Sequence, residues 1–529
     1  MRLVLALVVV GFASFFLKLG SIGLIGPDES RYAQVARDMM ERADWVTPKL
    51  QGEPWLDKPP LYYWAAAGSM RLLGETEAAL RLPSALAASA TCLAVACIGA
   101  WWFGFATGLR SALVLSASLG MILYGRAAIM DALLTLALTI GLGAYALYVT
   151  TRPSVWWLLT ASVALGFGFL AKGPIAIALP LLIVVPFHWL EHRRGTETRR
   201  PTLPGVAHLA LSLMCFLAVV MPWHVAILEK TGWEYVEIFF LQNNVDRFFT
   251  TVHRHPGPFY YYLPVLGVAL LPWSGFAPAA IVRAVRAVES RRLFLLLWIA
   301  MPLLFFSVSR SKLPGYVLPV LPPFALLIGL LWKVPDGSET PAVTWLNRSL
   351  LLNVAWCMVL GAAAVHGVMG RAPDLVTAGR WLAALLVGLA AATYLVGRRR
   401  PGTAFWTSLI TSLGLTLFLV HYLAPKVEPY QSLKTLASKG LSVLKPGERI
   451  ICYKAFYPQA HFYARDRLGE IWTLEEFRNR AADWGRIVSL TEPGHYRELQ
   501  EEESLETLVI ARAGNRILIE VQPHTPVDP

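Results

Sequence analysis

Residues 26–64 read GPDESRYAQVARDMMERADWVTPKLQGEPWLDKPPLYYW and directly follow the first apolar segment of the chain. This stretch places Asp28, Glu29, Arg31, Asp57 and Lys58 beside aromatic residues and prolines. The chain as a whole is poor in charge, since 16% of its 529 residues are charged and 56% are hydrophobic. Ionisable groups at a membrane are costly and are therefore more often functional than incidental. The stretch thus indicates a functional segment beside a membrane.

Apolar runs long enough to cross a membrane occupy much of the chain. A soluble domain carries about one quarter charged residues, whereas apolar runs of about 16 to 24 residues are typical of membrane-spanning helices. We count thirteen such runs, at roughly 3–25, 82–103, 109–125, 130–149, 155–171, 174–190, 206–228, 260–282, 293–308, 317–332, 346–369, 379–397 and 403–424. The sequence therefore predicts a polytopic α-helical membrane protein with about 13 transmembrane helices.

The basic residues indicate how these helices are oriented. A cytoplasmic N-terminus places most loop cations on the inner side, as the positive-inside rule requires. These cations are Arg110, Arg152, Arg193, Arg194, Arg199, Arg200, Arg283, Arg286, Arg291, Arg292, Lys333, Arg348 and Arg398 to Arg400. This topology explains most of the net charge of +12, so that nucleic-acid binding is disfavoured. The first segment lacks a cleavage site of small residues and is predicted to be retained as a helix.

An odd number of spans places the C-terminus outside, together with the longest polar segments. These segments are 26–80, 229–259 and 425–529. Within the first, apolar residues recur at helical spacing over 28–43, which predicts a helix lying in the interface plane. Prolines favour the first turn of a helix, so Pro59-Pro60 predicts a second short helix over Leu61–Leu73.

The tail is predicted to form a small α/β domain. Short strands are indicated at Arg449–Tyr453, Leu508–Ala511 and Arg516–Val521, and helices at Ser432–Leu444 and Leu474–Asp483. The sequence therefore divides into a transmembrane domain and an outer α/β domain, with bounds 1–424 and 425–529.

Two acidic positions are candidates for catalysis. Asp28 and Glu29 begin the first outer helix, where a carboxylate can serve as a general base for an acceptor hydroxyl or orient that hydroxyl. Acids are also favoured at a helix N-terminus for purely structural reasons. Asp131 begins an apolar span on the same outer side. A purely structural role at the helix N-terminus is open for Asp131 as well.

Several cations depart from the positive-inside pattern. Lys58, and the loop SRSKLPGY from Ser309 to Tyr316, place positive charge outside. Phosphate is the natural ligand for such groups, with lysine as a point charge and arginine as a fork. Arg31, Lys172 and Arg247 could contribute. For any single cation, a solvated or snorkelling side chain is an equally good interpretation.

Two histidines, His253 and His255, leave a metal site open. A site for a divalent ion such as Zn²⁺, Mg²⁺ or Mn²⁺ would need further ligands, of which Asp57 and Asp246 are candidates. The alternative is that both histidines are polar loop residues near Tyr260–Tyr262. No Walker loop, dinucleotide fingerprint or GxSxG elbow is present in the sequence, so a lipid-borne substrate is favoured.

Six motifs, taken in order, resemble the bacterial membrane glycosyltransferases that use polyprenyl-phosphate sugars. They are PDESRYA (27–33), DKPPLYYW (57–64), Asp131 at the start of its span, AKGP (171–174), VDRF to HPGPFYYYLP (245–264) and SKLPGYVLP (311–319). The pattern is similar to the lipid A 4-amino-4-deoxy-L-arabinose transferases, within the protein O-mannosyltransferase-like superfamily. The resemblance covers about the first 330 residues.

The resemblance implies a GT-C fold with its active site in an outer cavity. It implies Asp28 as the acidic residue of the first outer loop, Asp131 as a second site residue, and Lys58 as the lysine associated with the lipid phosphate. It also places several residues on segments that resemble the carrier-binding parts: Arg31, Lys172, Arg247, Lys312 and Tyr316. Glu29 and Tyr62 belong to the matching motifs. A metal position would correspond to Asp57 with a histidine.

The sequence therefore predicts an inverting glycosyltransferase of the bacterial inner membrane. The sugar would come from undecaprenyl phosphate, and the favoured acceptor is lipid A on the outer side. Transfer to protein or polysaccharide is one alternative. A lipid transporter or flippase is a rival from another class, but transporters place ionisable residues near the midplane of repeated halves, and neither feature is seen here.

Overall fold

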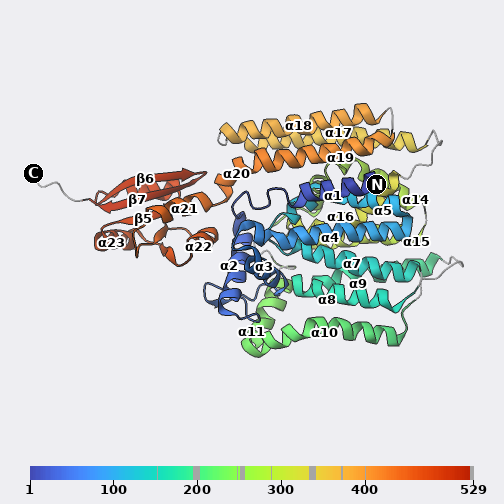
Figure 1. Cartoon of the computed structure of the whole chain (residues 1–529), viewed down its shortest axis with the longest axis horizontal. Helices are drawn as coiled ribbons and strands as arrows, with labels where there is room; N and C mark the ends of the chain where they lie inside the picture. Colours follow the sequence, from blue (N-terminus) through green and yellow to red (C-terminus); the bar gives the residue numbers. More distant parts are fainter. Residues whose placement is uncertain are drawn as a thin grey trace, which may run out of the picture.

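The computed structural model describes residues 1–151, 153–194, 203–246, 248, 250, 256–287, 289–332, 341–370, 373–398 and 401–524. Among these residues, ten helices are long and apolar enough to cross a membrane, or up to twelve if each of two bent pairs forms one span. The spanning elements are α4 (Glu77–Phe103), α7 (Asp131–Thr150), α8 (Val155–Lys172), α9 (Ile175–Arg194), α10 (Val206–Thr231), α15 (Ser290–Val308), η4 with α16 (Pro314–Val320 and Leu321–Leu331), α17 (Pro341–Val368), α18 (Pro373–Gly397), and α19 with η5 and α20 (Pro401–Phe418, Leu419–Leu423 and Ala424–Gln431). They lie side by side in one bundle (Figure 1), which confirms the polytopic helical fold.

The structure differs from the predicted thirteen spans at three places. The first run forms only α1 (Arg2–Phe15), which is 14 residues long. The second difference is a bend of 65° between α5 (Phe105–Ser116) and α6 (Leu119–Gly125). The third is a bend of 117° between the helical turns Phe259–Ala269 (η2 and α13) and Ser274–Arg286 (η3 and α14).

The two bends lie against each other. The backbone N–H of Leu119, released at the first bend, donates to the carbonyl of Leu271 at the second, over 2.9 Å. A backbone group in a membrane has no water to bind, so a broken helix needs such a partner. Pro272 follows directly and cannot supply the N–H that a continuous helix would use.

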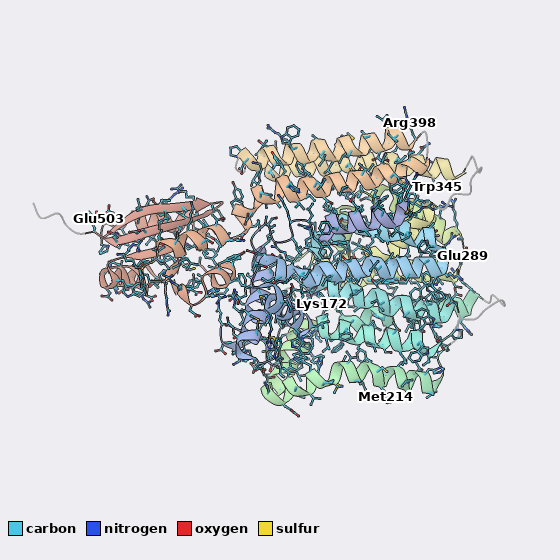
Figure 2. All side chains as sticks on the ribbon, viewed as in Figure 1. Lys172, Met214, Glu289, Trp345, Arg398 and Glu503 are labelled. Atoms are coloured by element: carbon cyan, nitrogen blue, oxygen red, sulfur yellow. The ribbon has the colours of Figure 1, made fainter. Side chains whose placement is uncertain are left out.

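The polar segments gather at one end of the bundle. The C-terminal domain, α2 and α3 all lie at the left end in Figure 1, whereas the N-terminus lies at the right end. Figure 2 shows Lys172 toward the end that carries the domain, and Glu289 and Arg398 at the opposite end. The N-terminus and the C-terminal domain therefore lie at opposite ends of the bundle.

The first outer segment contains the two predicted helices. They are α2 (Gly26–Arg42) and α3 (Leu61–Leu73), joined through a short antiparallel pair, β1 (Lys49–Leu50) and β2 (Glu53–Pro54). The apolar side of α2 packs against α3 and the C-terminal domain in one buried cluster. It is thus covered by protein, where the sequence had predicted contact with the membrane interface.

The start of α2 is tied to the bundle by a buried ion pair. The Glu29 carboxylate accepts from Arg81 of α4 at 2.8 and 3.0 Å, from the N–H of Ile25 at 2.7 Å and from that of Ala128 at 2.6 Å. Arg81 also donates to the carbonyls of Leu19, Ile22 and Gly23. A buried charge is tolerated when it is paired and fully hydrogen-bonded, and this pair fixes the helix that carries Asp28.

The C-terminal domain is a mixed five-stranded sheet with the strand order β4-β3-β5-β7-β6. The strands are β3 (Ile450–Tyr453), β4 (Leu468–Ile471), β5 (Ile487–Thr491), β6 (Leu505–Ala513) and β7 (Arg516–Pro523). The helices are α21 (Lys434–Val443), α22 (Pro458–Ala464), α23 (Leu474–Trp484) and α24 (Pro493–Gln500). Three strands and two helices occur near their predicted positions, while β4, β5, α22 and α24 were not predicted.

Helix α22 docks this domain on α2. The Phe462 ring is buried in the cluster beneath α2, its carbonyl accepts from Arg37 at 3.0 Å, and the Arg37 guanidinium lies 4.2 Å from the ring centroid. Arg37 also pairs with Glu75 at 2.8 Å, and the desolvation that accompanies its burial lowers its pKa. The domain therefore rests on the helix that presents Asp28.

Replacing Phe462 with alanine should release this contact. Loss of a buried phenylalanine costs about 3–5 kcal/mol, so local opening of α22 should become about 100- to 4,000-fold more frequent. Hydrogen–deuterium exchange of peptides from α22 measures that opening. Phe456→Ala is the matched control, because Phe456 precedes the same helix and is 41% exposed. Unchanged exchange in Phe462→Ala would show that other contacts hold the domain.

Candidate active site

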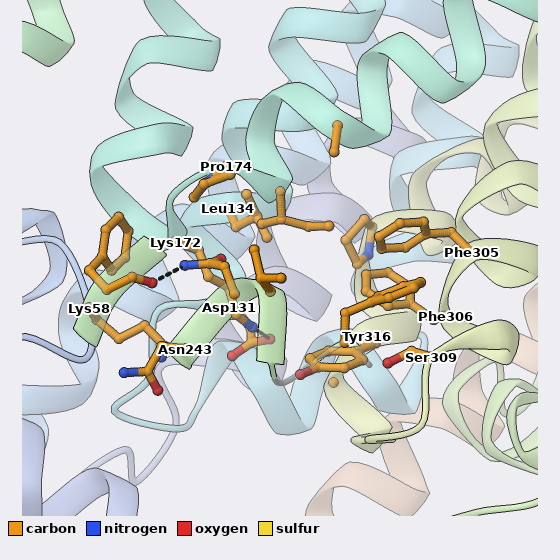
Figure 3. Close-up of a pocket in the computed structure, with 18 residues that line it drawn as sticks. Lys58, Asp131, Leu134, Lys172, Pro174, Asn243, Phe305, Phe306, Ser309 and Tyr316 are labelled. Carbon is orange, nitrogen blue, oxygen red and sulfur yellow. Dashed lines mark hydrogen bonds and ion pairs between the residues drawn. The ribbon is translucent and has the colours of Figure 1, made fainter. Parts of the chain in front are cut away.

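A cavity of about 370 Å³ opens at the end of the bundle beneath the first outer segment. Its polar lining comes from separate parts of the chain: Lys58, Asp131, Lys172, Asn243, Asn244, Ser309 and Tyr316. Figure 3 shows Lys58, Lys172, Asp131 and Asn243 on one side of the cavity, with Phe305 and Phe306 on the other. One side is therefore polar and the rest is an apolar channel.

The polar side contains a direct ion pair. Lys172, at the end of α8, donates to Asp131, at the start of α7, over 2.6 Å. Its ammonium also lies 5.4 Å from the centroid of the Tyr316 ring, and that ring stacks on Phe306. This 2.6 Å contact holds the Lys172 ammonium in place, so Asp131 is suited to orienting Lys172.

The other predicted cations are distributed around this cavity. Lys58 lines it and pairs with Asp57 at 2.8 Å. Lys312 is buried, and its ammonium donates to the carbonyls of Ser307 and Ser309 at the end of α15. It therefore stabilises the loop that carries Tyr316, and burial lowers its pKa. Arg247 lies outside the described residues.

A second cavity, of about 510 Å³, lies on the other side of Tyr124. It is lined by Asp28, Glu29, Arg81, Tyr124 and Arg126, and by apolar residues of α6, η5 and α20. Like the first cavity, it combines an apolar wall with a polar end.

Asp28 has the more accessible carboxylate of the two predicted catalytic acids. Its side chain is 60% exposed, whereas that of Asp131 is 16% exposed. The nearest cation is Arg31, at 3.8 Å, and the Arg31 guanidinium lies over Trp55 at 5.9 Å. Arg31 is thus placed beside the acid rather than in the first cavity.

Gly315 and Tyr124 form the wall between the two cavities. A Cβ atom at Gly315 would lie 2.7 Å from the Tyr124 ring, 3.0 Å from its hydroxyl and 3.0 Å from Asp131 Oδ1. Gly315 lines the first cavity and Tyr124 the second. The cavities therefore approach each other where Asp131 lies, and only a residue without a side chain fits there.

Three carboxylates influence one buried hydroxyl beneath this junction. Burial raises the pKa of Tyr32 well above its ordinary value, and Asp28 raises it further, with smaller effects from Asp57 and Asp131. Electrostatic effects of this kind require proximity. Carboxylates that are about one hundred residues apart in the chain therefore act on the same hydroxyl.

Two predicted site residues, Glu29 and Tyr62, make side-chain contacts that stabilise the fold. The carboxylate of Glu29 is engaged by Arg81 and backbone groups, as described above, although it lines the second cavity. Tyr62 is fully buried and donates to the carbonyl of Leu80 over 2.7 Å. Neither arrangement leaves a free polar atom for a substrate, and their assignment to the site stays a prediction.

The metal site also stays a prediction. Among the described residues no group of three or more His, Cys, Asp and Glu side chains could hold an ion. His253 and His255 lie outside them, and the Asp57 carboxylate would have to exchange Lys58 for the metal.

Sequence reasoning did not identify Tyr124, Gly315 or Arg126 as site residues. Gly315 lies in the quoted motif SKLPGYVLP, and a glycine beside a functional motif can mark a close approach of the backbone. Tyr124 lies near the end of α6, and Arg126 directly follows that helix. An arginine at the end of an apolar helix was the available signal.

Comparisons with known proteins agree on the kind of protein. Residues 1–235 match the family described as dolichyl-phosphate-mannose-protein mannosyltransferase. The undecaprenyl phosphate-α-4-amino-4-deoxy-L-arabinose arabinosyl transferase of Pseudomonas aeruginosa (strain UCBPP-PA14) is 34% identical over 434 residues, which cover 78% of this chain and 75% of that protein. The enzyme of the same name from Yersinia pestis (strain Pestoides F) is 28% identical over 429 residues, covering 78% and 74%.

The fold has a solved counterpart. The crystal structure of ArnT from Cupriavidus metallidurans bound to undecaprenyl phosphate superposes with a TM-score of 0.78 at 22% identity, covering 98% of this chain and 97% of that one. This likeness shows the GT-C fold of a multi-pass membrane protein. Together with the identity to the Pseudomonas enzyme, it establishes that the chain is a membrane glycosyltransferase belonging to the family of the undecaprenyl phosphate-α-4-amino-4-deoxy-L-arabinose arabinosyl transferases.

Proposed function

We propose that this protein transfers 4-amino-4-deoxy-L-arabinose from undecaprenyl phosphate to lipid A, with inversion at the anomeric carbon. The donor and sugar are those that the names of the relatives state. The observation that carries the proposal is the pair of cavities that approach each other at Gly315. The N-terminus is then cytoplasmic, and both cavities open toward the periplasmic side.

The first cavity suits the donor. Its apolar part can hold part of a prenyl chain, and its polar side presents Lys58 and Lys172 to a phosphate. As the bond from the anomeric carbon to the phosphate oxygen breaks, its electron pair remains on undecaprenyl phosphate. Cations placed where this charge develops stabilise the transition state.

The second cavity suits a lipid acceptor. Most of its wall is apolar, from α6, η5 and α20, whereas Asp28 and Arg126 provide polar contacts. A protein or polysaccharide acceptor has no acyl chains that would pack against such a wall. Lipid A combines acyl chains with a polar headgroup, and therefore fits both parts.

Asp28 is the proposed catalytic acid-base group. An acceptor hydroxyl would pass its proton to the exposed Asp28 carboxylate as its oxygen bonds to the anomeric carbon. An acceptor phosphate is already ionised, and Asp28 would then orient it. Asp131 acts as a positioning residue for Lys172, through their 2.6 Å contact.

The proposal is tested with purified protein in nanodiscs, supplied with the undecaprenyl-phosphate aminosugar and lipid A. Mass spectrometry should detect lipid A carrying one added sugar, and free undecaprenyl phosphate in equal amount. Modified protein or polysaccharide in cells, with unmodified lipid A, would overturn the acceptor. Movement of the donor across liposomes without transfer would instead identify a flippase.

Replacing Gly315 with alanine tests the approach of the two cavities. The added methyl group must displace the Tyr124 ring or the Asp131 carboxylate, and a misplacement of about 1 Å can cost about 100-fold in rate. We expect a loss of that size in sugar transfer with an unchanged melting temperature. Gly388→Ala is the control, because a Cβ at Gly388 meets nothing within 4 Å. Full activity in Gly315→Ala would show that sugar transfer does not depend on the approach of the two cavities at Gly315.

A further inference from the structure

The C-terminal domain contains a separate cavity rich in arginine. It measures about 240 Å³ and lies between α24 and the hairpin of β6 and β7. Its lining includes six residues with large side chains: Tyr496, Arg497, Gln500, Arg512, Arg516 and Ile517. Three of the six are arginines, and the lining contains no Asp or Glu. The cavity is therefore strongly cationic.

Some of the other arginines in the domain are held in ion pairs within the chain. Arg480 pairs with Glu476, and Arg486 pairs with both Glu448 and Glu520. Within 401–524, Arg497, Arg512 and Arg516 make no ion pair at or below 4.0 Å. The same holds for Arg449, Arg467 and Arg478, but those three do not line this cavity. A cluster of like charges repels itself unless an anion joins it. Three unpaired guanidinium groups that line one cavity indicate a place for an anion from outside the domain.

Arg516 provides a second and independent indication. Its Nε and Nη1 atoms are buried and have no hydrogen-bond partner among the described residues. Its guanidinium lies 5.3 Å from the centroid of the Tyr457 ring, whose hydroxyl reaches Glu492 at 3.4 Å. Ring stacking fixes the plane of the guanidinium. A buried charged donor without an acceptor is costly. The Arg516 guanidinium is therefore placed to bind an acceptor that the described residues do not supply.

The donor chemistry selects the class of ligand. Each guanidinium presents planar, fork-like N–H groups that match the oxygens of phosphate or carboxylate. Three guanidiniums around one cavity favour a group with several oxygens and more than one negative charge. We propose that this cavity binds a phosphate group, either on a lipid headgroup or as a free ion.

The place of the cavity favours the lipid source. A Cβ at Gly514, in the turn of the β6–β7 hairpin, would lie 2.7 Å from the carbonyl oxygen of Pro429 in α20. The turn therefore packs on the last part of a membrane span, 402–431. Val427 of the same helix lines the second cavity. The hairpin lies beside α20 in Figure 1, at the end of the bundle where lipid headgroups are expected.

The test measures hydrogen–deuterium exchange of the full chain in phosphatidylcholine nanodiscs. One arm adds inorganic phosphate, with chloride matching the ionic strength. The other arm mixes phosphatidic acid into the nanodisc. Peptides spanning Pro493–Gln500 and Arg512–Ile517 should exchange severalfold more slowly with the ligand that binds. Protection by the ion alone identifies a free anion, and protection by the lipid alone identifies a headgroup.

Two variants and one control make the result specific. Arg516→Gln and Arg512→Gln should each abolish the protection, and the exposed position of Arg512 keeps its variant folded. Arg478→Gln, an exposed arginine elsewhere in the domain, should keep it. Protection by neither ligand, or equal protection in the Arg516 and Arg512 variants, would overturn the proposal. No sugar transfer is measured, so this outcome leaves the proposed function untouched.

Discussion

Replacing Asp28 with asparagine is expected to lower the rate of lipid A glycosylation by about 100-fold or more, with the fold intact. General acid–base catalysis contributes about 100- to 10,000-fold, and loss of an orienting contact can also cost about 100-fold. Asparagine keeps the shape of the side chain but cannot accept a proton. The measurement is steady-state transfer by purified protein in nanodiscs, read by mass spectrometry of lipid A.

The pH profile distinguishes the two roles of Asp28. If Asp28 removes a proton, the acidic limb of the wild-type kcat profile should disappear in the variant. If Asp28 orients an ionised phosphate, the limb should remain and the change should fall mainly on KM. Asp38→Asn is the matched control, because Asp38 lies on the same helix and pairs with Arg42. Undiminished sugar transfer in Asp28→Asn would show that the Asp28 carboxylate has no role in the reaction.

Replacing Arg81 with leucine is expected to destabilise the protein by about 3–5 kcal/mol. The Glu29 carboxylate would keep only its two backbone N–H partners while remaining buried, and breaking one side of a buried ion pair costs about this much. The carbonyls of Leu19, Ile22 and Gly23 would also lose their donor. Fluorescence-detected size-exclusion chromatography after heating should show a marked fall in melting temperature.

A double variant separates charge from packing at this position. Combining Arg81→Leu with Glu29→Leu removes the unpaired charge, so it should melt above the single Arg81→Leu variant. Arg71→Leu, at an exposed position of α3, should melt like the wild type. Equal melting of the single and double variants would show that the lost carbonyl contacts, rather than the carboxylate, dominate.

Local patterns in the sequence were sufficient for most of the secondary structure. Most apolar runs became spans because a membrane-embedded backbone must satisfy its own hydrogen bonds, and a helix does so within one segment. Helix α3 occupies the predicted range Leu61–Leu73, since Pro59-Pro60 defines its start. The bends after Ser116 and Ala269 were missed, because an apolar run has the same composition whether it is straight or broken.

The sequence alone predicts the class of this protein: a polytopic membrane chain with its candidate site residues on one side, and with motifs of a glycosyltransferase family. The tertiary structure alone decided which charged groups meet. It pairs Glu29 with Arg81, which are 52 residues apart, and it pairs Asp131 with Lys172. It also places Asp28 in a different cavity from Lys58. Such contacts depend on how each helix is rotated and packed against its neighbours. That information is distributed over the whole bundle, whereas a motif records only its own residues.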